Sequence, residues 1–244
     1  FRTNAMEGRS FNYHKQYLRY HKHNIPDHYV LGYNMVSYLR KKTNDPMIWE
    51  KVVKRSWDVP FIPFAFSNAL KKETGMYVTD LYNDMAAQRR KDYESAIAGL
   101  TFTSFERVNQ RNSSAYTDYM FPQVMPDGRV LVQVSGIGDI ERLSLLSPSG
   151  EEEKRYVQGI VNEAAMLSMN KQRVVWNEYR FDPRWLVKAY SVIKGYDFAT
   201  GIATVISSHS RYSAAAIAPD GIRVATIETT SDYLTRLVIL SYAS

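Results

Sequence analysis

Three histidines near the start of the chain have side chains whose type and spacing could support metal chemistry. One residue separates His21 from His23, and His28 follows five positions later. Because imidazole nitrogens are common zinc ligands, the three side chains could together hold a metal ion. The same residues also fit a solvated basic loop ahead of a helix. We favour the loop and expect no metal site.

A polar run at 207–212 contains His209 and Arg211, with serines on both sides of the histidine. A serine–histidine hydrolase would also need an acidic partner and a nucleophile elbow, but Gly-x-Ser-x-Gly is absent from the sequence. The run therefore indicates a hydrogen-bonded corner between two strands. Because such loops often contact partners, both residues are candidates for binding.

Residues 177–185 are unusually rich in aromatic and arginine side chains for a hairpin loop. Arginine and tryptophan are frequent anchors at protein interfaces, which makes this loop a candidate binding surface. An internal latch, in which Asp182 pairs with Arg184 or Arg180, would explain the same composition. The sequence leaves both interpretations open. The candidate residues are Arg180, Asp182, Arg184 and Trp185.

Composition excludes several other kinds of function. The chain has 244 residues, a net charge of +6 and no cysteine, which rules out disulfides, thiolate metal ligands and cysteine nucleophiles. Residues 1–100 carry the basic excess, with 16 Lys and Arg against 10 Asp and Glu. These cations fall near expected helix ends, and no nucleic-acid-binding module is recognisable. We expect no nucleic-acid partner, and no apolar stretch is long enough for a membrane span.

The elements that must position these residues differ between the two halves of the chain. Residues 1–100 are helical in pattern, with one helix over 65–74 that ends at Gly75 and a packed, non-helical connection over 59–63. After about residue 100 the hydrophobic period changes to two, which is typical of strands. A polar segment at 101–118 serves as the linker.

Three turn signals recur about 45 residues apart, which is the length of a four-stranded propeller blade. They are Pro126-Asp127-Gly128, Asn170-Lys171-Gln172 and Pro219-Asp220-Gly221, and each precedes two short apolar runs of strand type. A propeller needs at least about four blades, and only about three begin here. The last apolar run, 237–240, lacks an outer partner and should recruit other strands. We also expect Trp176 and Trp185, which flank one hairpin, to be largely buried.

The stretch 25–39 resembles the helix that follows the zinc site in gluzincin metallopeptidases, the aminopeptidase-N-type group. It contains Tyr29-Val30-Leu31-Gly32 and then Tyr38-Leu39, which match a Tyr-x-x-Gly motif and an aromatic–leucine pair. With the repeats that follow, the chain resembles envelope proteins of Bacteroidota that join a gluzincin-like domain to a Tol-type, WD-like β-propeller.

The resemblance implies an α+β multidomain fold. The helical C-terminal part of a gluzincin-like domain would occupy residues 1–100, a linker 101–118, and about three blades of an incomplete β-propeller 119–244. Tyr29 would be the catalytic tyrosine that stabilises the oxyanion, provided that a zinc site lies upstream of Phe1. The zinc-binding His-Glu-x-x-His motif is absent from this sequence, so the chain by itself should hold no cofactor, although zinc is possible in a longer protein.

Two functions follow as hypotheses. The first is a non-catalytic, protein-interaction or scaffold segment of a bacterial cell-envelope protein (periplasmic, outer-membrane-associated or at the surface). Its partner would be another protein or the missing blades of the same polypeptide. The alternative is a fragment of an active zinc metallopeptidase whose zinc-binding motif lies upstream of Phe1.

Overall fold

The computed structural model describes residues 1–109, 114–161 and 167–242. The chain divides into two compact units, Phe1–Ser104 and Phe105–Ser244, which we describe separately. The division falls inside the segment 101–118 that the sequence assigns to the linker, of which 110–113 lie outside the described residues.

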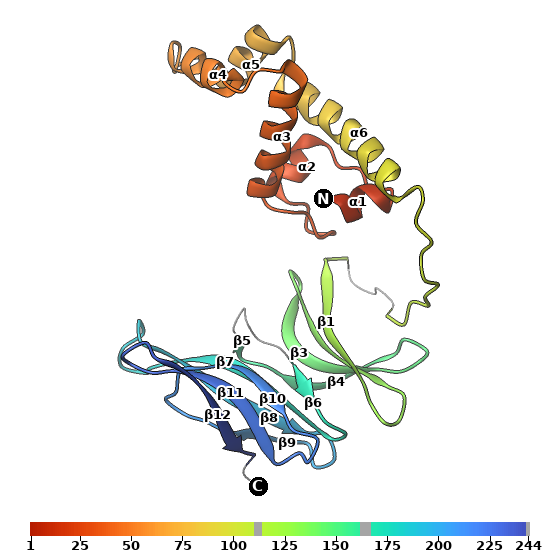
Figure 1. Ribbon diagram of the computed structural model, residues 1–244, viewed down its shortest axis with the longest axis vertical. Coiled ribbons are helices and arrows are strands. Elements are labelled where there is room, and N and C mark those ends of the chain that lie inside the picture. The colour runs from red at the N-terminus through yellow and green to blue at the C-terminus, as the bar shows by residue number, and fades with distance from the viewer. Residues whose placement is uncertain (110–113, 162–166, 243–244) are drawn as a thin grey trace. The chain divides into compact units, whose positions relative to one another are not determined.

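The first unit is helical (Figure 1). Its described helices are α1 (Arg2–Met6), α2 (Tyr13–Leu18), α3 (His28–Thr43), α4 (Ile48–Trp57), α5 (Ala65–Thr74) and α6 (Val78–Ile97). The core forms where α3 and α6 pack together with α4 and α5. Its fully buried side chains include Leu39, Val52, Leu70, Leu81 and Met85.

Local signals determine where α3 begins and where α5 ends. Asp27 Oδ1 accepts hydrogen bonds from the backbone N–H groups of Tyr29 and Val30, at 3.0 and 3.1 Å, and so caps the start of α3. Gly75 follows α5 in the left-handed conformation, with φ of 79°, which favours glycine. The predicted helix over 65–74 is therefore confirmed.

The connection between α4 and α5 differs from its prediction. We expected residues 59–63 to pack against the helices, but Phe61 is 96% exposed, and Ile62 and Phe64 are exposed as well. The two prolines do prevent helix, as expected. They do not determine whether the segment is covered, because that depends on the residues that lie opposite.

The second unit consists of three antiparallel sheets among the described residues. The first contains β1 (Thr117–Val124), β2 (Val130–Gly136), β3 (Asp139–Leu146) and β4 (Glu152–Val157) in that order. The second contains β5 (Ile160–Val161), β6 (Ser168–Met169), β7 (Arg173–Phe181), β8 (Ala189–Asp197) and β9 (Ile202–Val205), with β5 and β6 both paired to β7. The third contains β10 (Tyr212–Ile217), β11 (Arg223–Thr229) and β12 (Thr235–Ser241).

Each predicted turn lies between two consecutive strands of one sheet. In each, the side chain of an Asp or Asn within the turn accepts a backbone hydrogen bond that stabilises it. Asp127 accepts from the N–H of Arg129, and Asn170 accepts from the N–H of Arg173. Asp220 accepts from the N–H of Ile222 in the same way. Such local bonds from Asx side chains stabilise a turn without any distant contact. The three turns and the strands that follow them are confirmed.

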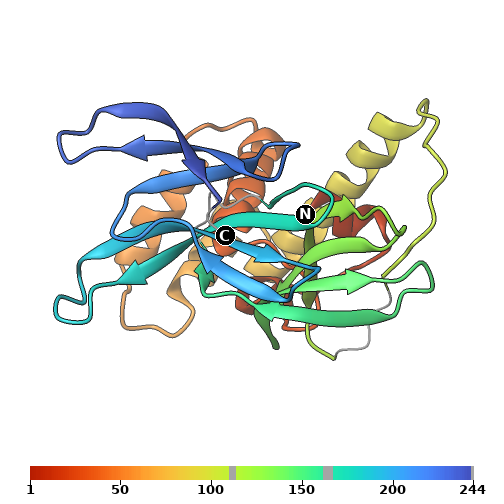
Figure 2. The ribbon, with the colours of Figure 1, turned by 90° about the horizontal axis from the view of Figure 1, so that it is seen from below.

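The second sheet lies between the other two (Figure 2). One of its faces packs Val174 and Trp176 against Leu131 and Leu145 of the first sheet. Its opposite face packs Val175 and Ile193 against the third sheet, through Ala215, Ile217 and Val224. Side chains on a strand alternate between faces, so neighbouring residues of β7 serve two different cores.

The expected fold class is wrong. We predicted the helical C-terminal part of a gluzincin-like domain followed by an incomplete β-propeller. The described residues instead form six helices that all end before residue 98, and then twelve strands in three separate antiparallel sheets, with no closed barrel or propeller among them. The turn spacing predicts single sheets well, because turns are local. It does not specify how sheets associate, which depends on side chains that meet between them.

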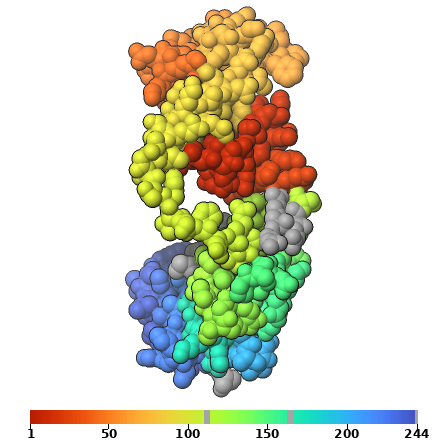
Figure 3. Space-filling model, turned by 90° about the vertical axis from the view of Figure 1, so that its right-hand side faces the viewer, coloured from red at the N-terminus to blue at the C-terminus, as the bar shows by residue number. Residues whose placement is uncertain are grey.

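The outer face of the first sheet is partly covered by the chain itself. Val108 packs against Val132, Val134 and Leu146, so the extended segment 105–109 lies over this face. Figure 3 shows this segment, in yellow-green, against the green atoms of the first sheet. An apolar groove of about 490 Å³ is left between them.

Candidate functional site

The predicted binding residues of the β7–β8 hairpin are held by a tight turn. Asp182 Oδ1 accepts hydrogen bonds from the backbone N–H groups of Arg184 and Trp185, at 2.9 and 3.0 Å. These two bonds hold the pKa of the Asp182 carboxyl below its usual range. The latch that we considered, an ion pair of Asp182 with Arg180 or Arg184, is absent from this part of the described chain. Arg180 pairs with Glu178 instead, at 3.1 Å.

Tyr190 connects this hairpin to the predicted histidine. Its hydroxyl donates to Asp182 Oδ2 at 3.3 Å, and its ring meets the imidazole of His209 edge to face, with 4.7 Å between centroids. The loop of His209 is itself joined to β8, because Ser191 and Ser210 exchange hydrogen bonds at 3.0 Å. The structure therefore brings together the two groups of residues that the sequence treats as separate candidates.

A third loop adjoins the loop that carries His209. Arg211 donates to the carbonyl oxygen of Thr230 at 3.4 Å, and its guanidinium lies 5.4 Å from the ring centroid of Tyr233. We call the three segments 181–188, 206–211 and 230–234 the loop rim. The tips of the β7–β8 and β11–β12 hairpins lie at the same end of the β unit (Figure 1, left).

The loop rim exposes large apolar side chains beside cations. Trp185 is 61% exposed, although we predicted it to be buried, and that expectation is wrong. Its apolar neighbours on the rim are also exposed; they are Phe181, Leu186, Val187, Tyr233 and Leu234. The side chain of Arg184 has no partner in the described structure, so its charge is available to a ligand.

A network of buried charged side chains joins β7 and β8, the two strands of this hairpin. Glu178 is fully buried, and its Oε1 accepts from Trp176 Nε1 at 2.8 Å and from the N–H of Gly159 at 2.9 Å. Lys194 Nζ lies 3.5 Å from Oε2 of the same carboxylate and 2.7 Å from the Tyr156 hydroxyl. A Cβ on Gly159 would come within 2.6 Å of Glu178 Oε2, so a larger residue there would displace this carboxylate. The network therefore fixes the base of the strand that carries Arg180.

The comparisons with known proteins give no family. No protein-family model matches the chain, and a search of the curated proteins finds no match. The description of the site therefore rests on the sequence and the structure of this chain.

The N-terminal candidates do not form a comparable site. Tyr29 is 75% exposed in the first turn of α3, and its predicted catalytic role stays a prediction. Within the described ranges, no three His, Asp or Glu side chains are grouped so that they could hold a metal ion, and this includes His21, His23 and His28. None of the helices in those ranges has the length and apolarity of a membrane span.

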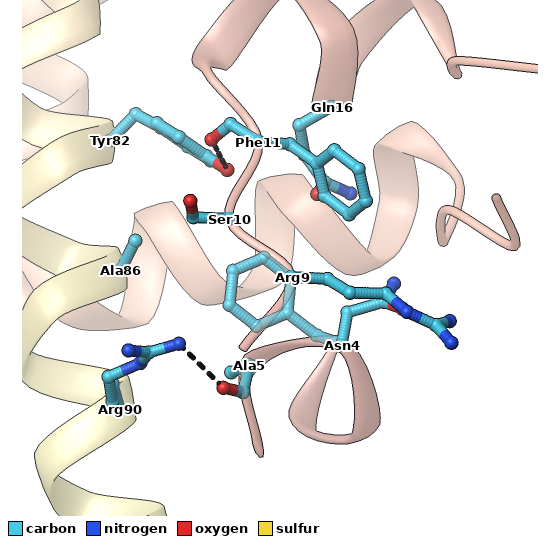
Figure 4. A pocket seen from close by; sticks show the side chains of 10 residues that line it. Asn4, Ala5, Arg9, Ser10, Phe11, Gln16, Tyr82, Ala86 and Arg90 are labelled. Atoms are coloured by element: carbon cyan, nitrogen blue, oxygen red, sulfur yellow. Dashed lines mark hydrogen bonds between the residues drawn. The ribbon is translucent and has the colours of Figure 1, made fainter. Parts of the chain in front are cut away.

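One hollow of the helical unit is too small to be a substrate site. It lies between the first residues of the chain and α6 and has a volume of about 70 Å³ (Figure 4). The figure shows Tyr82 donating to the carbonyl of Phe11 and Arg90 donating to the carbonyl of Ala5, at 2.8 Å each. Ligand pockets usually measure about 300 Å³ or more. These bonds serve to attach the first segment to α6.

The sequence analysis did not identify all of the exposed residues of the loop rim. It did not single out Leu186, Val187 or the tip residues Tyr233 and Leu234. A usable signal was present, because Ser231-Asp232 between two apolar strands indicates a hairpin tip, where a following aromatic residue is exposed. Local sequence could not show that the tips of the β7–β8 and β11–β12 hairpins lie near the loop of His209.

Proposed function

We propose that this chain is a non-catalytic protein-interaction segment and that the loop rim is its binding surface. The observation that carries the proposal is the exposure of Trp185, Leu186 and Val187 next to the unpaired Arg184, with Tyr233 exposed on the loop that Arg211 contacts. Large exposed apolar side chains close to arginine are typical of interface anchors. Because Asp182 and Tyr190 already fix the loop backbone, a partner would meet a preorganised surface, which lowers the cost of ordering on binding.

The charge of the rim suggests the chemistry of the partner. Arg184, Lys188 and Arg211 are exposed on it, against the carboxylates of Asp182 and Asp232. The Asp182 carboxylate is already engaged by backbone N–H groups, so cations dominate what a ligand meets. A protein segment that combines acidic and apolar side chains is complementary to this surface. It would belong to a partner protein or to further parts of the same polypeptide.

A peptide-binding experiment tests the proposal. The probes are synthetic peptides in which Asp or Glu alternates with Leu or Phe, compared with peptides that carry Lys in place of the acids. We expect the acidic set to bind, and Trp185→Ala or Arg184→Glu each to weaken binding about tenfold, which is about 1.4 kcal/mol. Trp57→Ala, an exposed tryptophan of the helical unit, is the matched control and should leave binding unchanged.

Two results would contradict the proposal. One is equal binding of acidic and basic peptides, or an equal loss with Trp57→Ala and Trp185→Ala. The other is cleavage of peptides by the purified chain with one equivalent of bound zinc. A bacterial cell-envelope location remains part of the proposal and rests on the sequence resemblance of residues 25–39 and the repeats alone.

A further inference from the structure

The connection between α4 and α5 contains the longest stretch of the sequence without a polar or charged side chain. It covers residues 59–66, Val-Pro-Phe-Ile-Pro-Phe-Ala-Phe, which we call the apolar tip. Within it Phe61 is 96% exposed and Phe64 81% exposed, and Trp57, just before the tip, is 73% exposed. A contiguous group of large exposed apolar side chains on a folded protein marks a site of interaction.

The backbone of the apolar tip has a defined shape. The N–H of Ile62 donates to the carbonyl of Val59 at 3.2 Å, and the N–H of Ala65 donates to the carbonyl of Ile62 at 3.1 Å. These bonds make two consecutive tight turns. Phe64 has a φ of 61°, in the left-handed region that a bulky side chain rarely adopts. Strain of this kind occurs chiefly at functional positions.

The tip is carried by the outer half of a helical hairpin. α4 and α5 lie side by side (Figure 1), and the ion pair of Arg55 with Glu73 joins them. No residue from 53 to 68 is buried. The buried residues of the two helices are Ile48, Val52, Ala69 and Leu70. The ends of both helices next to the tip therefore extend beyond the core of the helical unit.

Cations lie on both helices close to the tip. Residues 54–72 contain four Lys and Arg and one acid, Asp58. Lys54 and Lys72 are exposed, and among the described residues neither has an ion-pair partner. At a rise of about 1.5 Å per residue, Lys54 lies about 5 Å from the end of α4, and Lys72 about 10 Å from the start of α5. An apolar end is thus followed by a positively charged zone.

We propose that the apolar tip inserts into the surface of an anionic lipid bilayer. Phe61, Ile62 and Phe64 enter the boundary between head groups and acyl chains, about 5–10 Å deep. Lys54 and Lys72 then lie at the level of the head groups, where cations attract acidic lipids. Protein interfaces combine apolar anchors with hydrogen bonds, and the tip has no side chain that can form one. A lipid surface therefore fits the tip better than a protein partner.

Co-sedimentation of the 244-residue chain with vesicles tests the inference. The probes are vesicles of phosphatidylcholine with about 30% phosphatidylglycerol and vesicles of phosphatidylcholine alone, and we expect the anionic vesicles to bind at least about tenfold more tightly. Phe61→Ser should weaken binding to the anionic vesicles about tenfold. Phe102→Ser, at an exposed phenylalanine outside the tip, is the matched control and should leave it unchanged. Circular dichroism confirms that both variants are folded.

Tryptophan fluorescence reports whether the tip enters the lipid. Bromine atoms on the acyl chains quench a tryptophan that reaches them, so anionic vesicles with brominated lipid should quench Trp57. Trp57→Phe should remove most of this quenching. Trp185→Phe, at an exposed tryptophan of the β unit, should retain it.

Three outcomes would overturn the inference. They are an absence of binding to the anionic vesicles, equal losses with Phe61→Ser and Phe102→Ser, and binding without quenching, which would show adsorption by charge alone. The first is the result expected if the tip instead meets a protein or the β unit. The test is independent of the proposed function, which is measured with peptides and no lipid, and Phe61→Ser leaves Trp185 and Arg184 unchanged.

Discussion

The ring of Tyr190 and the imidazole of His209 meet edge to face with 4.7 Å between their centroids. This contact joins the β7–β8 hairpin to the loop that leads into the third sheet. Through its hydroxyl, Tyr190 also reaches Asp182, so one side chain connects the turn of the hairpin with the adjacent loop. The candidate binding residues therefore form one surface rather than two unrelated loops.

Asp182 should be needed for the shape of the hairpin tip. Asp182→Ala removes Oδ1, the acceptor of the N–H groups of both Arg184 and Trp185, and we expect the free energy of unfolding to fall. Asp182→Asn keeps a side-chain oxygen that can accept and should cost less than half as much. Urea unfolding of both variants checks this, and equal losses would mean that the charge, not the turn, stabilises the tip.

Trp176 should be among the residues that contribute most to the stability of the β unit. It is fully buried between the first and second sheets, so Trp176→Ala should lower the free energy of unfolding by about 3–5 kcal/mol. Trp185→Ala, in the same hairpin but exposed, is the control and should change it by less than about 0.5 kcal/mol. If the two variants unfold at the same denaturant concentration, the assignment of Trp176 to the core is wrong.

The contribution of the buried Glu178 carboxylate to the free energy of unfolding should depend on its partner Lys194. Removing one partner leaves the other charge buried, so Glu178→Ala and Lys194→Ala should each cost about 3–5 kcal/mol. The double variant should cost less than the sum of the two, which a double-mutant cycle measures. Arg180→Ala, which removes the exposed partner of the same carboxylate, should cost less than about 1 kcal/mol. Strict additivity of the two buried variants would show that the charges do not interact.

Acid should weaken the third sheet through Asp220. The N–H of Ile222 and the guanidinium of Arg223 lower the pKa of this carboxyl from 3.8 to about 2. A depressed pKa in the folded state contributes stability above the unfolded pKa, and this contribution is lost as the pH falls from about 4 to about 2. Asp220→Asn should therefore reduce the pH dependence of the melting temperature in that window.

Thermal melts followed by circular dichroism at a series of pH values supply the measurement. The same slope for Asp220→Asn and the unchanged chain would exclude a role for Asp220.

Local sequence was sufficient to predict elements whose stability is local. Asp127, Asn170 and Asp220 each close a turn with bonds to residues two or three positions away, and Gly75 ends α5 by its own backbone conformation. These interactions need no distant partner. For that reason the turns, the strands beside them and the helix over 65–74 could be predicted from the sequence.

Burial could not be predicted in the same way. Trp176 and Trp185 belong to one hairpin and have the same side chain, yet the first is buried and the second exposed. Trp176 faces Leu131 and Leu145 of the first sheet, whereas Trp185 lies beyond the ends of the strands. The residues that decide this difference come from more than 30 positions away in the chain.

The sequence by itself determined the two kinds of secondary structure, the positions of the turns and the presence of aromatic and arginine side chains at 177–185. Only the tertiary structure decided that Tyr190 connects Asp182 with His209, that Arg211 lies over the ring of Tyr233, and that the second sheet packs between the other two. The physical reason is that turns depend on bonds between near neighbours. The packing of sheets depends on which side chains meet after distant segments have come together.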